Sequence, residues 1–162
     1  MTLRYVDNID AIMAAEREAR KQLQTGTLLI NGKTLNIQYS LQDMGELKHL
    51  FDNDLNTVMR TMEANPLKVN AAYQQDQKTR SIALKIGGNA SRVKIDLLDK
   101  DGRPIYSDER TYDETPDPRV IQFNFDEMLT FRSFNLEVES LHSPEPAHVH
   151  LWEIMILENQ DE

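Results

Sequence analysis

The feature that most constrains the fold is a series of short segments, between residues 81 and 157, in which apolar and polar side chains alternate. Residues 81–86 show the pattern clearly, because small or polar residues separate Ile82, Leu84 and Ile86. Since successive side chains of a strand point to opposite faces, each segment is predicted to be a β-strand. The predicted strands cover residues 81–86, 92–99, 103–112, 120–125, 131–141 and 148–157.

Turn signals separate these strands. Gly87-Gly88-Asn89 and Lys100-Asp101-Gly102 are predicted turns, and residues 113–118 and 143–146 are predicted loops. No helical segment lies between the strands to carry the chain from one parallel strand to the next. The pattern therefore predicts an antiparallel β-sandwich.

The N-terminal segment has the pattern of a helix rather than a strand. Residues 7–24 are predicted to be helical, with Asp7 or Asn8 as the cap and Gly26 ending the helix. Apolar residues recur at spacings of three and four, with Glu16 interrupting the stripe. The stripe consists of Tyr5, Ile9, Ile12, Ala19 and Leu23.

A single helix of this length is only marginally stable in isolation, so it is expected to pack against another part of the protein or against another chain. Two alternatives stay open. The helix docks on its own domain, or it docks on another chain as an oligomerising or anchoring element. In the second case the interaction residues are Tyr5, Ile9, Ile12 and Leu23.

The dipeptide Asn31-Gly32, between two apolar-rich runs, predicts a β-hairpin, because a type I′ turn needs positive φ at both central residues. An isolated hairpin is unstable in water, so it must join a sheet of the main domain or of a neighbour. The predicted organisation is an extension over residues 1–41, a sandwich over 42–158 and a polar tail over 159–162.

Residues 42–69 connect the extension to the sandwich. Residues 43–51 are predicted to form a short helix, and a dense polar run follows at residues 52–57, Asp-Asn-Asp-Leu-Asn-Thr, which we call the polar knot. Asn65-Pro66 then imposes an extended backbone.

Charge and composition exclude several classes of function. The chain carries 27 acidic and 18 basic residues, a net charge of −9, so binding to nucleic acid or to an anionic membrane is not expected. It has no cysteine, which excludes disulfides, thiolate zinc sites and cysteine nucleophiles. We find neither a signal peptide nor a long apolar run. The protein is expected to stay in the cytoplasm or to leave it within an assembly.

Three motifs, in order, resemble the discoidin-like, galactose-binding-like β-sandwich family, also called F5/8 type C. The opening motif is residues 51–57, FDNDLNT, and the closing strands are residues 131–138, FRSFNLEV, and 150–154, HLWEI. Residues 82–102 resemble the strand-turn-strand in the middle of the family. The resemblance covers about residues 42–157 and implies a mainly β, jelly-roll sandwich, here preceded by a helix and a hairpin.

The chain departs from the family at several points. Asp52-Asn53 replaces the usual Asp-Gly, and the aromatic residue expected soon after the threonine is absent, because Val58-Met59 follow. The cysteine pair of secreted members is also missing. These departures favour a relative assembled inside the cell over a secreted lectin.

The resemblance also implies a structural Ca²⁺ between the opening loop and the closing glutamate. Carried onto this chain, the ligands are Asp52, Thr57 and Glu153, with carbonyl groups near His49, Asp54 and Trp152. Such oxygen ligands suit Ca²⁺. The alternative is that Asp52 and Asn56 only satisfy backbone donors of a turn.

Other sites are less favoured by the sequence. The polar knot nearly matches an EF-hand loop, but Thr57 stands where that loop needs glycine. His148 and His150 share a strand face and could bind a transition metal with His142, although a surface pair is the preferred interpretation. Trp152 is interpreted as a core residue. No catalytic motif is present, so a non-enzymatic role is expected.

Three functions remain open. The first is a structural assembly protein, most plausibly a bacteriophage virion component of the neck, tail, baseplate or head decoration, assembled in the host cytoplasm. Its partners would be other copies of itself or neighbouring virion proteins. The alternative is a glycan- or receptor-binding module for adhesion, and the third is a sandwich enzyme or an enzyme accessory domain.

Overall fold

The structure is a computed structural model that describes residues 2–62, 64–141 and 148–158, with the side chains of residues 2–7, 17, 20 and 21 left out. The predicted polar tail at residues 159–162 lies outside the described residues. In chain order the elements are α1 (Thr2–Lys21), β1 (Leu23–Ile30), β2 (Lys33–Ser40), β3 (Gln42–Met44), η1 (Leu47–Phe51), β4 (Met59–Thr61), β5 (Leu67–Ile86), β6 (Ser91–Leu98), β7 (Pro104–Tyr112), β8 (Arg119–Ser140) and β9 (His150–Leu157).

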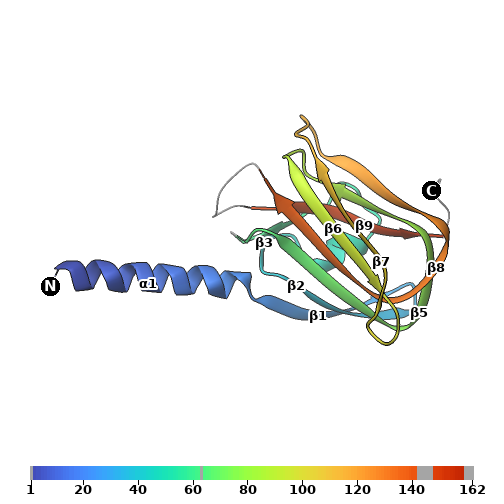
Figure 1. Ribbon diagram of the computed structural model, residues 1–162, viewed down its shortest axis with the longest axis horizontal. Helices are drawn as coiled ribbons and strands as arrows, with labels where there is room; N and C mark the ends of the chain where they lie inside the picture. The colour runs from blue at the N-terminus through green and yellow to red at the C-terminus, as the bar shows by residue number, and fades with distance from the viewer. Residues whose placement is uncertain (1, 63, 142–147, 159–162) are drawn as a thin grey trace.

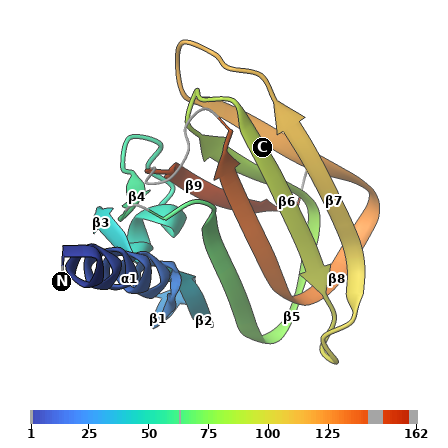
Figure 2. The ribbon, with the colours of Figure 1, turned by 60° about the vertical axis from the view of Figure 1, so that its left-hand side comes forward.

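The strands form an antiparallel sandwich in which two long strands, β5 and β8, belong to both layers (Figures 1 and 2). The first part of β5 lies between β2 and the second part of β8, and β6 and β7 extend that layer. The second part of β5 lies between β9 and the first part of β8, and β4 and β3 extend this other layer. The predicted sandwich is confirmed.

The length of β5 and β8 differs from the sequence prediction. Residues 120–125 and 131–141 were expected to be two strands, but both lie in β8. The polar residues 74–80 also continue β5, and Gln77 and Lys78 pair there with Phe131 and Thr130. Residues 74–80 are all polar, although Gln77 and Thr79 among them are buried, so the stretch shows no alternation of apolar and polar side chains. The period-two pattern is therefore lost where the ladder continues.

The core fills the space between the two layers. Its largest fully buried side chains include Phe123, Phe131 and Phe134 from β8, with leucine and isoleucine side chains from both layers packed around them. At the bend, the buried Thr79 hydroxyl lies within hydrogen-bond distance of the carbonyl oxygens of Ser81 and Leu157, at 2.7 and 2.8 Å. The hydroxyl thus joins β5 to the end of β9.

The hairpin prediction is confirmed, and the hairpin belongs to the sandwich. Asn31 and Gly32 have φ of 51° and 77°, as a type I′ turn requires. β2 pairs with β5, and Leu35 and Ile37 are buried in the common core. Of the predicted extension over residues 1–41, only α1 therefore stands outside the sandwich.

The helix boundaries differ from the prediction of residues 7–24. α1 ends at Lys21, and both Leu23 and Gly26 lie in β1. A Cβ at Gly26 would lie 3.0 Å from Leu47 Cδ2 and 3.2 Å from Tyr39 Cε1. This glycine allows close packing against β1 and does not mark the end of a helix.

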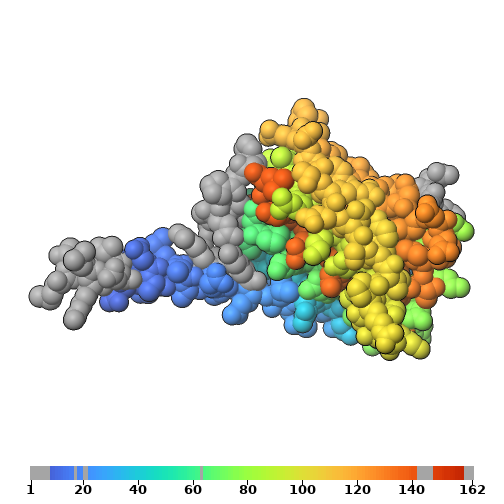
Figure 3. Space-filling view, in the orientation of Figure 1, coloured from blue at the N-terminus to red at the C-terminus, as the bar shows by residue number. Residues whose placement is uncertain are grey.

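α1 projects away from the sandwich without packing on it (Figures 1 and 3). Ile9 and Ile12 of the predicted stripe are 38% and 59% exposed, whereas Leu23 is half-buried at the start of β1. The side chain of Tyr5 lies outside the described residues. Within the described part of the chain, no helix is long and apolar enough to cross a membrane.

The predicted helix over residues 43–51 is a short strand followed by a turn of 3-10 helix. β3 and η1 occupy this segment, and the side chains of Leu47 and Leu50 in η1 are buried. Gly45, at a φ of 81°, joins the two, and a Cβ there would lie 2.0 Å from the Val58 carbonyl oxygen. Only glycine suits this approach of the backbone to the segment before β4.

Because α1 buries little against the sandwich, we predict that a chain beginning at Gln22 melts within about 2 °C of the full chain. Phe134→Ala, in the core, should instead cost about 3–5 kcal/mol. Thermal denaturation of dilute samples followed by circular dichroism would measure both. A large loss of stability on removing α1 would mean that the helix packs on its own sandwich in solution.

Candidate functional site

The polar knot is a closed turn held by its own side chains. The Asp52 carboxylate accepts hydrogen bonds from the Asp54 N–H and the Thr57 hydroxyl, both at 2.9 Å. The Thr57 hydroxyl also lies 3.1 Å from the Asp54 carbonyl oxygen and 3.4 Å from that of His49. Several oxygen atoms therefore converge on Thr57, as the resemblance implied for the calcium ligands.

Glu153 of β9 reaches the knot from the sandwich. It is fully buried, and its Oε2 accepts a 2.7 Å hydrogen bond from the Asn53 N–H. Its Oε1 is buried with no hydrogen-bond partner in the described structure. Burial, together with the nearby charge of Asp52, raises the pKa of Glu153 to about 8.

A β-bulge in β9 positions the Glu153 carboxylate at the polar knot. Lys85 pairs with Glu153, but the next residue, Ile86, pairs with Leu151, so Trp152 is an extra residue in β9. Lys85 also lies 5.7 Å from the Trp152 ring and donates to the carbonyl oxygen of Leu55 in the knot. The bulge and Lys85 thus fix the knot against β9.

The residues of the knot fit a calcium ion. An orphaned, buried carboxylate oxygen costs free energy unless a cation or proton joins it, and Glu153 Oε1 is such an atom. Asp52 and Thr57 supply further oxygens beside it, and Asp54 would contribute its carbonyl, because its carboxylate accepts the Asn56 N–H. No group of three or more His, Asp or Glu side chains gathers in the described residues, so the other ligands would be hydroxyl and carbonyl oxygens.

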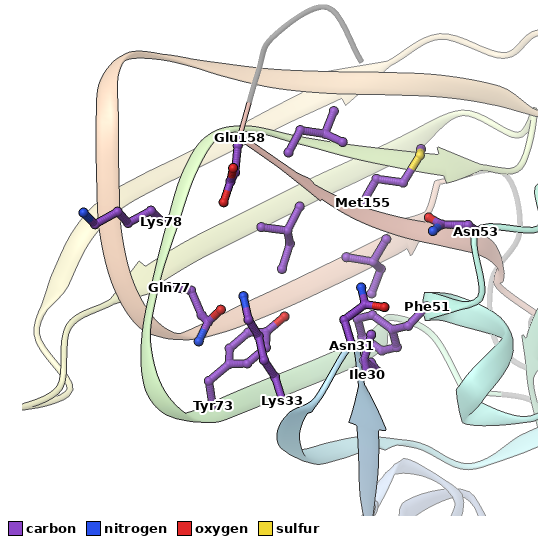
Figure 4. Close-up of a pocket in the computed structure, with 13 residues that line it drawn as sticks. Ile30, Asn31, Lys33, Phe51, Asn53, Tyr73, Gln77, Lys78, Met155 and Glu158 are labelled. Carbon is purple, nitrogen blue, oxygen red and sulfur yellow. The ribbon is translucent and has the colours of Figure 1, made fainter.

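Next to the knot lies a cavity of about 360 Å³ (Figure 4). Its walls come from four separate parts of the chain: the β1–β2 turn, the start of the knot, the bend of β5 and the end of β9. Phe51 and Asn53 line the cavity and also flank Asp52, so the knot and the cavity share a wall. Sequence reasoning missed this cavity, because only the fold brings the four segments together.

The cavity is amphipathic. Tyr73, Gln77 and Lys33 lie together on one side, and Phe51, Asn31 and Asn53 lie toward the other (Figure 4). Apolar side chains of β9, from Ile154 to Leu157, complete the lining. Burial raises the pKa of Tyr73 to about 12, so its phenol keeps its proton at neutral pH.

Gln77 is 8% exposed, and its amide nitrogen donates to the Gln75 carbonyl oxygen at 2.9 Å. Lys33 and Glu158 are exposed and form no ion pair with any described residue. The cavity therefore offers both donors and acceptors to a ligand.

In the described part of the chain, no third His, Asp or Glu joins His148 and His150 in a group that could hold a metal ion. His148 Nδ1 lies 2.8 Å from the Thr61 carbonyl oxygen and 3.6 Å from Asp43, whose carboxylate is held by Arg60 at 2.8 and 3.1 Å. His142, the third predicted ligand, lies outside the described residues. His150 instead stacks on Trp152, with ring centroids 5.8 Å apart.

Trp152 is only partly buried, so its interpretation as a core residue is wrong. Burial alternates along the start of β9, and Trp152 lies on the face opposite to the buried Leu151 and Glu153. The indole therefore lies on the surface beside His150 and Lys85.

Comparison with known proteins places the fold. No family model matches the chain, and no curated protein matches its sequence. Among solved structures, the family 32 carbohydrate-binding module of Clostridium perfringens NanJ, in complex with galactose, has a TM-score of 0.57 at 14% identity, covering 82% of this chain and 98% of that one. A second C. perfringens module, CpGH89CBM32-5, in complex with GalNAc-β-1,3-galactose, has a TM-score of 0.59 at 11% identity, covering 76% and 94%.

A Ruminococcus gnavus GH29 fucosidase also matches, with a TM-score of 0.60 at 10% identity. The match covers 78% of this chain but only 26% of the enzyme, so the chain spans about a quarter of the length of that protein. The chain therefore has the galactose-binding-like sandwich fold that the sequence motifs predicted. Most of these similar structures are carbohydrate-binding modules and not catalytic domains.

The buried carboxylate predicts a pH-dependent effect of Glu153→Gln. Since the pKa of Glu153 is raised above that of the unfolded chain, about 4.3, its protonated form stabilises the fold at low pH, and this contribution is lost as pH rises through about 8. Glutamine cannot ionise and can keep the bond from the Asn53 N–H. In EDTA, we expect the variant to melt at the parent temperature at pH 5 and several degrees higher at pH 9.

The matched control is Glu127→Gln, which changes an exposed glutamate on β8 and should shift neither melting temperature. Thermal denaturation at both pH values measures the effect. If Glu153→Gln changed the melting temperature equally at pH 5 and pH 9, Glu153 would be either neutral or well solvated across that range.

Proposed function

We propose that the protein is a non-enzymatic glycan-binding module that holds a sugar in the cavity beside the polar knot. The observation that carries this proposal is the amphipathic lining, in which the Tyr73 and Phe51 rings lie among the amides of Gln77, Asn31 and Asn53. The fold supports it, because similar folds are found in modules solved with galactose and with GalNAc-β-1,3-galactose. The volume of the cavity suits one or two sugar rings.

The lining fits the chemistry of a sugar. A pyranose ring has C–H faces that pack on aromatic and aliphatic side chains, and hydroxyl groups that both donate and accept hydrogen bonds. Lys33 donates only, Glu158 accepts only, and the amide of Gln77 offers its oxygen and its second N–H, because one N–H already donates to Gln75. A polyol would find partners for most of its hydroxyl groups.

To test sugar binding, we would screen the full chain on a glycan array that includes galactose and N-acetylgalactosamine termini, and measure the best ligand by titration calorimetry. Lys33→Ala should weaken binding about tenfold, or about 1.4 kcal/mol, because a charged hydrogen bond is lost. Lys33 is exposed, so its removal should not change stability.

Lys100→Ala is the control, since it removes an exposed lysine from the β6–β7 turn that does not line the cavity. If no glycan binds at millimolar concentration, the proposal fails. If a glycan binds equally to both variants, the module binds sugar at a different surface.

We also propose that the polar knot holds a structural Ca²⁺, with Asp52, Thr57, Glu153 and the carbonyl of Asp54 as ligands. The buried, unpaired Oε1 of Glu153 supports this proposal. When bound, the ion would neutralise the two carboxylates and fix the turn. Asp52, whose pKa is held below its ordinary value by the Asp54 N–H and the Thr57 hydroxyl despite partial burial, is ionised and ready to bind at neutral pH.

Calcium should therefore raise the melting temperature of the protein. A concentration of one hundred times the dissociation constant adds about 2.7 kcal/mol, or roughly 5–10 °C. Asp52→Asn and Glu153→Gln should abolish the increase, whereas Asp101→Asn, in the exposed β6–β7 turn, should keep it. Thermal scans with EDTA, CaCl₂ and MgCl₂ measure it, and an identical response of all variants would refute the site.

A structural role in an assembly such as a bacteriophage virion is the second candidate. Projection of α1 from the sandwich, with Ile9 and Ile12 exposed, supports it, because an exposed helix of this kind suits docking on a neighbouring subunit. Electron microscopy of concentrated protein tests it. Regular rings, tubes or sheets would support this role, and a uniform field of single particles would count against it.

A further inference from the structure

Among the described residues, β1 and β7 form the edges of one layer, and β3 and the first part of β8 form the edges of the other, and these edges differ in how they are protected. β7 carries Pro104 and the charged residues Asp108, Glu109 and Arg110, and β3 is only three residues long and contains Asp43. Charges, proline and short length are the usual ways in which an edge strand avoids pairing with another chain. β7 and β3 are therefore protected, and at the edge formed by the first part of β8 the Arg110 guanidinium of β7 donates to the Gln122 carbonyl oxygen at 3.0 Å.

β1 has none of these protections. Its eight residues, LQTGTLLI, include no charge and no proline, and among the described residues it pairs only with β2. Its other edge thus presents a row of unpaired backbone donors and acceptors. An edge of this length without protection is expected to be covered by a further strand.

The surface beside this edge is apolar. Leu29 is 74% exposed, the highest exposure of any large hydrophobic residue in the described chain. A hollow of about 280 Å³ lies between the end of β1 and η1. It is lined by Leu28, Leu29, Ile30, Asn31, Lys48, Phe51 and Asp52. A strand added to β1 would lie next to this hollow.

The charge distribution favours a second copy of the chain as the partner. Residues 1–41 contain five basic and four acidic residues, whereas residues 42–162 contain 13 basic and 23 acidic ones. Two sandwiches repel each other, but two N-terminal segments do not. Pairing through β1 joins two chains where their charges are balanced and keeps their acidic parts apart.

We propose that β1 pairs antiparallel with β1 of a second copy around a two-fold axis, forming one continuous sheet across the dimer. In Figure 1, α1 continues beyond the start of β1, away from the body. In such an antiparallel pair, the start of β1 in one copy lies beside the end of β1 in the other. α1 of each copy therefore extends beyond the Asn31-Gly32 turn of the other copy. The same edge of each copy forms the contact, so the interface is self-complementary. This proposal does not depend on sugar binding.

The test uses the full chain. Sedimentation velocity from about 1 to 200 µM should show a monomer–dimer equilibrium. Leu29→Lys places a charge on the exposed edge and should weaken the dimer at least tenfold without lowering the melting temperature. Ile105→Lys is the matched control, because Ile105 is also an exposed apolar residue on an edge strand, β7, and it should leave the dimer unchanged.

Cross-linking tests the geometry, since the chain has no cysteine of its own. Thr25→Cys, near the middle of β1, should form an intermolecular disulfide on mild oxidation, whereas Ser107→Cys, exposed on β7, should not. A monomer at every concentration would overturn the proposal. So would a dimer that survives Leu29→Lys but is lost when residues 1–21 are removed, which would assign the contact to α1 alone.

Discussion

Pairing of β5 with β8 over most of their lengths is the constraint on which the rest of the structure depends. Residues 67–72 and 81–86 of β5 pair with residues 133–138 and 119–124 of β8, so the same two strands hold both layers in register. Between these regions the strands bend, and the bend carries Tyr73 and Gln77 to the rim of the sandwich. The cavity exists because this bend meets the β1–β2 turn and the end of β9.

The buried carboxylate of Glu153 is the part of the molecule that packing alone does not explain. A buried glutamate with an unpaired oxygen destabilises a fold, and a glutamine or an apolar residue would avoid that cost. The Asn53 N–H, the β-bulge and Lys85 nevertheless hold the carboxylate against the knot. Because Asn53 of the knot and the preceding Phe51 line the cavity, whatever neutralises Glu153 also fixes one wall of the cavity.

The sequence predicted those features that depend on local chemistry. Positive φ at Asn31-Gly32 and the alternation in residues 81–86 and 92–99 follow from neighbouring residues, so the hairpin and the strands were found. The opening and closing motifs also predicted that Glu153 lies at the polar knot, where its carboxylate accepts the Asn53 N–H. Alternation is absent at residues 74–80, where β5 bends, so the continuity of that strand and the cavity beside it were missed.

Gly26 shows the same limit of local sequence patterns, here through a wrong prediction and not a missed feature. In the sequence it follows a helical pattern and resembles a helix stop, but its role is to let Leu47 and Tyr39 approach β1, a contact that no local pattern contains.

The cavity and the hollow beside β1 meet at the same place, because Ile30 and Asn31 line both. Lys33 and Glu158 are exposed, so water would compete for the polar contacts of a sugar in the proposed site, and a single site would bind weakly. In a dimer paired through β1, two cavities are related by a two-fold axis and held on one sheet. A glycan that presents two sugars at the matching separation would bind both sites, and the second contact would cost no further loss of translational freedom. Assembly would then determine which glycans are retained, although the lining of each cavity stays the same.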